Sequence, residues 1–264
     1  MVTEKKWMLL SGLPRTAATA LGSIFAQNPD VHFGGHSPLV PLLHGIKESV
    51  DGNARENLVM LNKHHGFKEK AMRNMAEFYY EDVSLPCVID KGRSWCCEAN
   101  RRYAKECLGE NVRHVILVRP IDEVVSSFAA LRKKNGWTGD IFSDLLEDGT
   151  DPIIWPFNGI IYSKFMDFQD TLFVSFDDII YNTQKTVSDI ANFVGFSEFN
   201  YSFSNIKEAV SHNDAFLQLD GLHDVRGTLS VRDHQIDLPA HIKELCGEYN
   251  QRMIDVGINL KLSK

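Results

Sequence analysis

The chain has 264 residues, 44% of them hydrophobic, which is enough to bury a full core, and we expect residues 1–264 to form one domain. A net charge of −7 without a long Lys/Arg tract argues against a nucleic-acid partner. No apolar run approaches the roughly 18 residues that span a bilayer, so we expect no membrane association and a cytoplasmic location.

Short apolar runs alternate with helical patterns along the chain. The runs that predict buried parallel strands are residues 7–10, 87–89, 115–118 and 172–174. Helical patterns follow each of them, at residues 17–27, 94–107, 121–134 and 183–194. Further helices are expected at residues 39–60, 67–80, 157–168 and 239–254. This alternation predicts an α/β fold of three layers, a central parallel sheet with helices on both faces.

Three other features of the chain carry an expectation. The aromatic stripe of Tyr162, Phe165, Met166 and Phe168 has helical spacing and is expected to pack in the core. The polar stretch 211–238 has little periodicity, and a loop of that length in a compact domain is typically a lid or binding loop. The five cysteines form an odd set without a C-x-x-C pair, which argues against a disulfide framework and against a zinc site, so we expect no metal.

A loop with the outline of a phosphate-binding loop follows the first predicted strand. In SGLPRTAATALG, residues 11–22, Gly12 and Thr19 match the first glycine and the hydroxyl of the pattern G-x-x-x-x-G-K-S/T. Ala17 replaces the second glycine and Ala18 the lysine, whereas Arg15 supplies a cation earlier in the loop. The pattern favours an anion other than a Mg²⁺-bound γ-phosphate. The alternative is an ordinary strand-to-helix turn with a chance Gly and Arg.

Cations also follow the next two predicted strands. Lys91 and Arg93 come after the second strand, and Arg119 with Ser127 comes after the third. The carboxyl ends of parallel strands share one edge of the sheet, where ligands bind. Because the chain is acidic overall, this gathering implies an anionic ligand with more than one charged group. Arg119 precedes a predicted helix start, where a positive charge is unfavourable unless an anion binds there, so we expect Arg119 to bind an anion. The alternative is that Arg119 is a surface arginine without a binding role.

These motifs resemble those of sulfotransferases. SGLPRTAATAL is similar to the family's 5′-phosphosulfate loop, and HVILVRPIDEVVSSF to its 3′-phosphate motif, in which a Ser follows an Arg by eight positions. LFVSFDDIIYNTQKTVSDIANFVGF resembles the strand and helix that come next in the family. The resemblance extends over about residues 8–195 and implies a P-loop-type fold. It also implies a donor, 3′-phosphoadenosine 5′-phosphosulfate (PAPS), whose reaction needs no metal ion.

The resemblance assigns donor-binding roles at matching positions. The residues that would hold the 5′-phosphosulfate, through side chains or backbone N–H groups, are Arg15, Thr16, Ala17, Ala18 and Thr19. Arg119 and Ser127 would bind the 3′-phosphate. Phe176 would lie near the adenine, and Arg226 with Gly227 matches a late loop that closes over the nucleotide.

The resemblance also indicates the catalytic groups. Lys91 and Arg15 would stabilise the charge that develops on the bridging oxygen as the S–O bond breaks. Arg93 stands where the cytosolic branch has a catalytic histidine, and a guanidinium is no base near neutral pH. NPDVHFGGHSPLVP resembles the segment of tyrosylprotein sulfotransferases that carries the general base, and its base position falls on His36. Since imidazole titrates near neutral pH, we predict that His36 is the base, the alternative being a loop histidine bonded to backbone.

The sequence thus predicts a sulfotransferase that moves a sulfuryl group from PAPS to a hydroxyl or amine of a small-molecule or peptide acceptor. A P-loop nucleotide kinase is the alternative enzyme, because residues 88–90 could end a Walker B strand. A catalytically inactive nucleotide-binding protein is the third possibility, suggested by Ala17 and Ala18. The sequence indicates neither the acceptor nor the oligomeric state.

Overall fold

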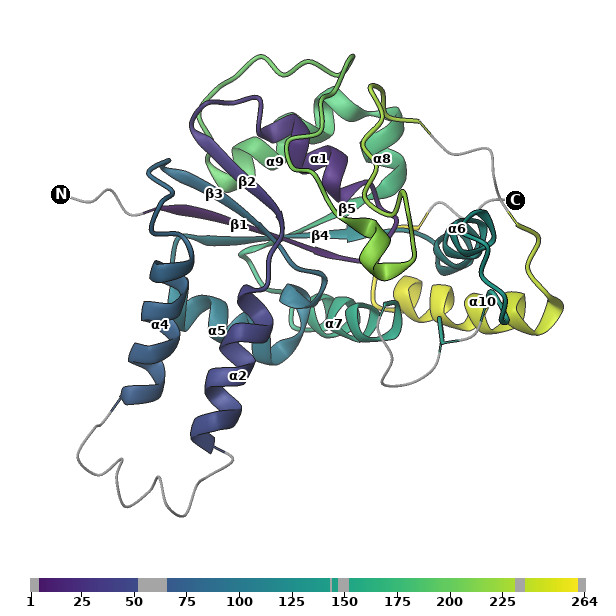
Figure 1. Ribbon diagram of the computed structural model, residues 1–264, viewed down its shortest axis with the longest axis horizontal. Helices are drawn as coiled ribbons and strands as arrows, with labels where there is room; N and C mark the ends of the chain where they lie inside the picture. Colours follow the sequence, from purple (N-terminus) through teal and green to yellow (C-terminus); the bar gives the residue numbers. More distant parts are fainter. Residues whose placement is uncertain (1–4, 52–65, 143, 147–151, 231–235, 261–264) are drawn as a thin grey trace.

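The computed structural model describes residues 5–51, 66–142, 144–146, 152–230 and 236–260. Its centre is a five-stranded parallel sheet (Figure 1). The strands are β1 (Lys6–Gly12), β2 (Val31–His36), β3 (Cys87–Lys91), β4 (Val112–Val118) and β5 (Thr171–Ser175). Their order across the sheet is β2-β3-β1-β4-β5, so β1 lies in the middle, between β3 and β4. The loop after β1 therefore lies at the topological switch point of the sheet, where such folds bind ligands.

One face of the sheet packs on the helices drawn above it in Figure 1. These helices are α1 (Ala18–Phe25), α8 (Phe176–Tyr181) and α9 (Thr183–Val194). Met8 and Leu10 of β1 share a buried cluster with Leu21 of α1 and Ile190 of α9. Residues alternate between the two faces along a strand, so Trp7 and Leu9 belong to a different cluster on the opposite face.

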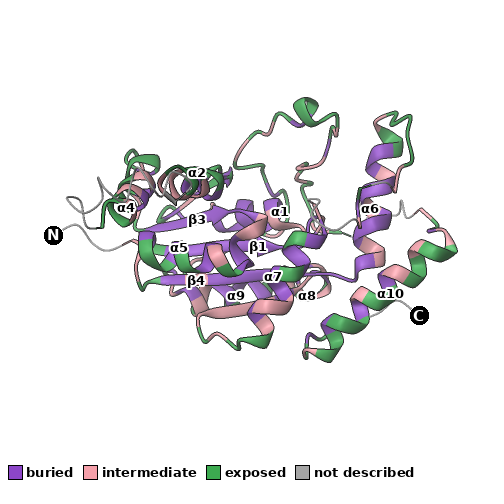
Figure 2. Cartoon of the chain, turned by 90° about the horizontal axis from the view of Figure 1, so that it is seen from below, coloured by how far each residue is buried: buried purple, intermediate pink, exposed green. Residues whose placement is uncertain are grey.

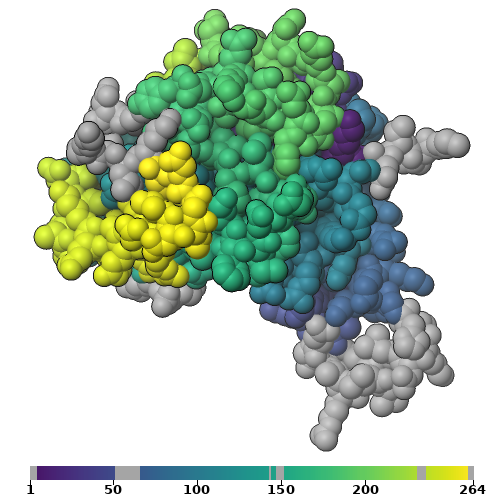
Figure 3. Space-filling view, turned by 180° about the vertical axis from the view of Figure 1, so that it is seen from behind, coloured from purple at the N-terminus to yellow at the C-terminus, as the bar shows by residue number. Residues whose placement is uncertain are grey.

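The opposite face is covered by helices that Figure 1 draws below the sheet or, for α6, beside its right end. They are α2 (Leu39–Asp51), α4 (Phe67–Tyr79), α5 (Glu98–Leu108), α6 (Ile121–Lys134), α7 (Ile154–Phe165) and α10 (Ala240–Asp255). Figure 2 shows that the strands are mostly buried while these helices turn exposed residues outward. Figure 3 shows the C-terminal helix α10 at one end of the molecule, where Met253 shares a buried cluster with Phe157 of α7.

The predicted α/β fold with three layers is confirmed. Helices α6 and α9 have the predicted bounds, and the other predicted helices are recovered with shifted ends. The segment predicted as one helix over 94–107 is instead a 3₁₀ turn, η1 (Arg93–Cys96), followed by α5. Helix α2 is described only as far as Asp51, and the remainder of the helix predicted over 39–60 lies outside the described residues.

Two elements of the structure were not predicted, and one prediction about packing was wrong in part. Strand β2 and helix α8 were not predicted, and β2 contains Gly34 and Gly35 at the place where its register with β3 shifts. The aromatic stripe prediction was wrong for Phe165 and Met166, which are 77% and 49% exposed. The buried side of α7 is formed by residues such as Phe157, so Phe165 falls on its outer side.

All five cysteines are free and buried. Among the described residues, no helix combines the length and the apolar character needed to cross a membrane.

Candidate functional site

The loop between β1 and α1 is anchored to β4 through Gly12. Gly12 has φ +111°, and a Cβ there would lie 2.2 Å from the backbone carbonyl oxygen of Leu117. The next residue, Leu13, donates its backbone N–H to the same carbonyl at 3.0 Å. Only glycine fits this close approach, which explains why the first glycine of the phosphate-binding pattern is retained.

Two residues of this loop with side chains adopt a left-handed backbone conformation. Arg15 has φ 61°, and Ala17, the residue before α1, has φ 61° and ψ 22°. Ala17 thus occupies a conformation that suits the glycine of the usual pattern, and a Cβ there costs about 1–2 kcal/mol. The loop keeps the turn of a phosphate-binding loop although the residue that favours it is missing. Helix α1 then starts at Ala18, and its first N–H groups are the kind of donors that bind anions.

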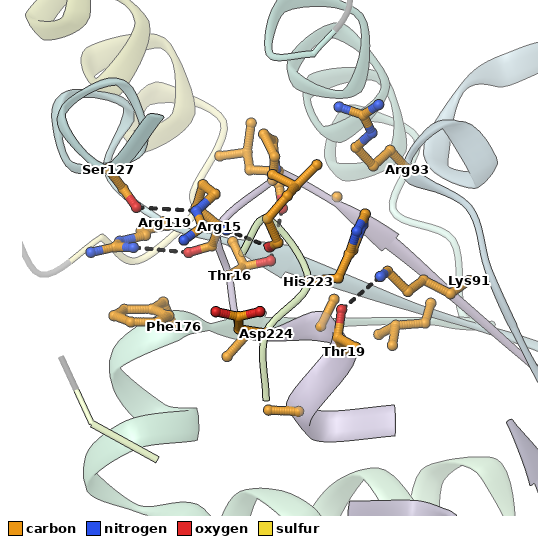
Figure 4. A pocket seen from close by; sticks show the side chains of 18 of the residues that line it. Arg15, Thr16, Thr19, Lys91, Arg93, Arg119, Ser127, Phe176, His223 and Asp224 are labelled. Atoms are coloured by element: carbon orange, nitrogen blue, oxygen red, sulfur yellow. Dashed lines mark hydrogen bonds between the residues drawn. The ribbon is translucent and has the colours of Figure 1, made fainter. Parts of the chain in front are cut away.

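A cavity of about 220 Å³ lies at this edge of the sheet (Figure 4). The positively charged side chains that line it are Arg15, Lys91, Arg93, Arg119 and Arg226. Two carboxylates, Glu123 and Asp224, also line it. The structure therefore brings together the cations that follow β1, β3 and β4. Thr16 and Ala17 of the loop and Ala18 and Thr19 at the start of α1 lie beside them.

Arg15 and Arg119 lie next to each other in this cavity. Arg15 donates Nε to Ser127 Oγ at 3.2 Å and Nη1 to the carbonyl of Leu222, while Arg119 donates Nη1 to the carbonyl of Arg15 at 2.8 Å. Arg119 also pairs with Glu123, with 2.9 Å between Nε and Oε2. Glu123 lies in the first turn of α6 and balances the charge of Arg119, so the helix dipole alone does not require an anion there.

The other predicted donor residues divide between the cavity and its surroundings. The Phe176 ring lies 3.9 Å from the Arg119 guanidinium, measured to the ring centroid, and Figure 4 shows the two stacked. Arg226 lines the cavity, but Gly227 does not. The Gly227 carbonyl instead accepts a hydrogen bond from the backbone of Ile206 at 2.9 Å, which holds this late loop in place. Thr16 donates its hydroxyl to the carbonyl of Leu13 at 2.7 Å, which closes the loop between β1 and α1 on itself.

Lys91 is a buried amine at the end of β3. It is 6% exposed, and Nζ donates to Thr19 Oγ1 at 2.8 Å. Burial and the neighbouring charge of Arg93 lower the pKa of Lys91 to about 7, against the attraction of Asp214. The charged form of Lys91 is therefore costly in these surroundings, and a bound anion would stabilise it.

His36 ends β2 directly across from Lys91 in the parallel register. It lines the cavity, and its side chain is exposed. Partial burial and the charges of Lys91 and Arg93 lower the pKa of His36 to about 4. The imidazole is therefore neutral at pH 7. Among the described residues, no hydrogen bond holds its ring.

A second histidine in the cavity was not predicted. His223 lies in the polar stretch after α9, and its Nδ1 is 2.6 Å from Asp214 Oδ1. Asp214 belongs to a 3₁₀ turn, η2 (Asp214–Leu217), and His212 stacks on His223 at 4.3 Å between ring centroids. The sequence predicts a binding loop over residues 211–238, but this stretch has no periodicity from which the pairing of His223 with Asp214 could be inferred.

Asp90, the residue that could end a Walker B strand, points away from the cavity. Its carboxylate accepts hydrogen bonds from Tyr80 Oη at 2.5 Å and Trp95 Nε1 at 2.6 Å. Burial raises the pKa of Asp90, against these hydrogen bonds. Asp90 is not among the residues that line the cavity, so it does not serve a metal-bound phosphate there.

The cavity fits a ligand with several anionic groups. It combines backbone donors at the start of α1 with cations from three strands, and Ser11 Oγ, a buried hydroxyl in its lining, has no hydrogen-bond partner within the described chain. No group of three or more metal-ligating side chains is found among the described residues.

Comparisons with protein-family models and with curated proteins find no match. Solved structures with a similar fold include several sulfotransferases. A sulfotransferase from Alicyclobacillus acidocaldarius has a TM-score of 0.55 at 10% identity, covering 98% of this chain and 97% of that one. The sulfotransferase domain from the curacin biosynthetic pathway gives 0.53 at 14% identity, covering 97% and 98%. That of the Synechococcus PCC 7002 olefin synthase gives 0.52 at 16% identity, covering 95% and 94%.

The chain therefore has the P-loop-type fold of the sulfotransferases, as the resemblance of its motifs implied.

Proposed function

We propose that the protein is a sulfotransferase that uses PAPS and transfers its sulfuryl group to a hydroxyl or amine of a small molecule or peptide. One observation carries the proposal. In a sulfotransferase fold, the loop after β1 and the end of β4 supply Arg15 and Arg119 to the same cavity, so two anionic groups of one nucleotide have partners there.

Each side chain then has a distinct task toward the donor. Arg119 and Ser127, at the end of β4 and in α6, would bind the 3′-phosphate, with the Phe176 ring near the adenine. Arg15 and Lys91 would bind the 5′-phosphosulfate and stabilise the charge that develops on its bridging oxygen. Lys91 also donates to Thr19 in the first turn of α1, so the same amine would position the start of this helix and bind the anion.

The kinase alternative has two obstacles in this cavity. Ala18 provides no cation where a kinase needs its lysine, and Asp90 is turned into the core. A kinase also needs Mg²⁺ to neutralise its phosphates. The inactive alternative was suggested by Ala17 and Ala18. The strain of the left-handed Ala17 would weaken nucleotide binding without removing a backbone donor. Turnover of PAPS separates this alternative from an enzyme.

A thermal-shift panel tests the proposal. The product nucleotide 3′-phosphoadenosine 5′-phosphate (PAP) at a hundredfold excess over its Kd should stabilise the fold by about 2.7 kcal/mol. ATP with Mg²⁺, GTP and AMP should each give much less at the same concentration, because none offers a 3′-phosphate to Arg119. A larger shift with ATP and Mg²⁺ than with PAP would contradict the proposal.

A further inference from the structure

The loop over the cavity carries a histidine that is held by a carboxylate. Asp214 is 8% exposed and accepts two hydrogen bonds from His223, one from the backbone N–H at 2.8 Å and one from ring Nδ1 at 2.6 Å. One bond fixes the backbone and the other the ring, so the imidazole has a defined orientation.

The hydrogen bond also defines which ring nitrogen is available. Burial would raise the pKa of Asp214, but the hydrogen bonds from His223 outweigh it and lower this pKa, so the carboxylate is ionised at neutral pH. An ionised carboxylate only accepts, so the proton of the neutral imidazole is on Nδ1. Nε2 then has its lone pair free to accept a proton, the arrangement in which a third group orients a general base.

His223 lies beside the groups expected to handle the sulfuryl group. It lines the cavity, where Figure 4 shows its ring close to Lys91, and the charge of Lys91 lowers the pKa of His223. The His223 ring stacks on the ring of His212, with an angle of 19° between the two ring planes. His36 lines the same cavity but is exposed, and within the described residues nothing hydrogen-bonds to its ring. Of the two histidines in the cavity, His223 is the one held in a fixed tautomer.

We propose that His223 is the general base of the transfer reaction and that Asp214 is its positioning residue. This rests on the proposed sulfotransferase function. The acceptor oxygen or nitrogen forms a bond to sulfur, and the bond between sulfur and the bridging oxygen breaks. That oxygen keeps the electron pair as part of the 5′-phosphate, and the acceptor's proton moves to Nε2 of His223, which later releases it to solvent.

The charges around His223 fit this role once the donor is bound. Burial and Lys91 lower the pKa of His223 to about 4, against the hydrogen bond and charge of Asp214, with a further lowering from His212. His36 also interacts electrostatically with this group. Since the donor brings several negative charges next to Lys91, it opposes the effect of the lysine and moves the imidazole toward neutral pH, where a base works best.

Hydrolysis of PAPS, in which water replaces the unknown acceptor, tests the proposal together with PAP binding by calorimetry. His223→Gln should lower the hydrolysis rate by about 10²–10⁴-fold, the usual contribution of a positioned base, while PAP affinity changes less than about threefold. His241→Gln is the matched control, because His241 is exposed on α10 and does not line the cavity. Unchanged hydrolysis in His223→Gln, or the full loss in His36→Gln instead, would overturn the assignment.

Asp214 variants separate positioning from a merely structural role. Asp214→Asn should lower kcat with little change in PAP affinity, because an amide also stabilises the wrong tautomer, and Asp214→Glu should recover part of the rate. Nitrogen-15 NMR of the imidazoles should show the His223 proton on Nδ1 at about pH 7, and this measurement does not depend on catalytic activity. A proton on Nε2 would overturn the proposal. Failure of the wild type to bind PAP would refute the sulfotransferase function itself, whereas PAP binding with a fully active His223→Gln refutes only the base.

Discussion

Glycine should be tolerated or stabilising at position 17 and destabilising at position 18. Ala17 is left-handed, which costs a residue with a Cβ about 1–2 kcal/mol, and Ala17→Gly removes this cost. Ala18 is the first residue of α1 and is not among the residues with positive φ. Both changes share two unfavourable terms. Glycine increases the conformational entropy of the unfolded chain, which lowers the free energy of unfolding by about 0.5–1 kcal/mol. Each change also removes one methyl group that packs on the same core cluster.

The shared terms cancel when the two variants are compared. Ala17→Gly should therefore be more stable than Ala18→Gly by about 1–2 kcal/mol, the cost of the left-handed conformation alone. For a chain of this size, 1 kcal/mol corresponds to about 2–4 °C in Tm.

Urea unfolding without nucleotide is the appropriate measurement, with a check that the denaturant slope is the same in both variants. Equal destabilisation by the two substitutions would show that Ala17 does not carry this strain, and the reasoning about the loop would be refuted.

Three further predictions concern the phosphate sites and the loop. Arg119→Ala should lower the affinity for PAP by about 10²-fold in a calorimetric titration and change the affinity for adenosine 5′-phosphate little, because only PAP has a 3′-phosphate whose charge loses its partner. Equal losses of affinity for both nucleotides would show that Arg119 has a structural role. Gly12→Ala should abolish soluble expression, since its Cβ would lie 2.2 Å from the Leu117 carbonyl oxygen. The control variant Gly45→Ala, which has open space around the new Cβ, should fold normally. A folded Gly12→Ala protein would contradict this prediction. Lys91, with its pKa lowered to about 7, is charged below that pH and neutral above it. The advantage of the wild type over Lys91→Met in PAP affinity should therefore be largest below about pH 7 and shrink as the pH rises; a constant ratio would contradict a titrating Lys91.

The sheet and the gathering of cations were predictable because both depend on local signals. Each buried strand is a short apolar run, and parallel strands end at one edge, so Lys91 and Arg119 had to meet the loop of Arg15 once the sheet formed. Strand β2 was missed because Gly34 and Gly35 interrupt its pattern at the register shift, although the same irregularity ends with His36 opposite Lys91.

The pairing of His223 with Asp214 could not be predicted in the same way. Asp214 lies in the short 3₁₀ turn η2 and His223 in irregular backbone, where sequence separation does not determine which side chains meet. The contact depends on the path of the whole loop, including the bond from Arg15 to the Leu222 carbonyl. The ion pair of Arg119 with Glu123 has the ordinary helical spacing of four residues and was therefore predictable, and it removes the need for an anion at the start of α6.

The central place of β1 also sets the order in which the molecule can fold. Its neighbours start at Cys87 and Val112, so β1 is made well before either of its partners in the sheet. The loop of Gly12 depends on the Leu117 carbonyl, and Leu13 hydrogen-bonds to it, so the cavity beside this loop takes shape only after β4 is present. Such long-range pairing is slow and leaves apolar strands exposed in the meantime. A nascent chain that ends before Val112 should therefore be unable to bind PAP, however well its first helices have formed.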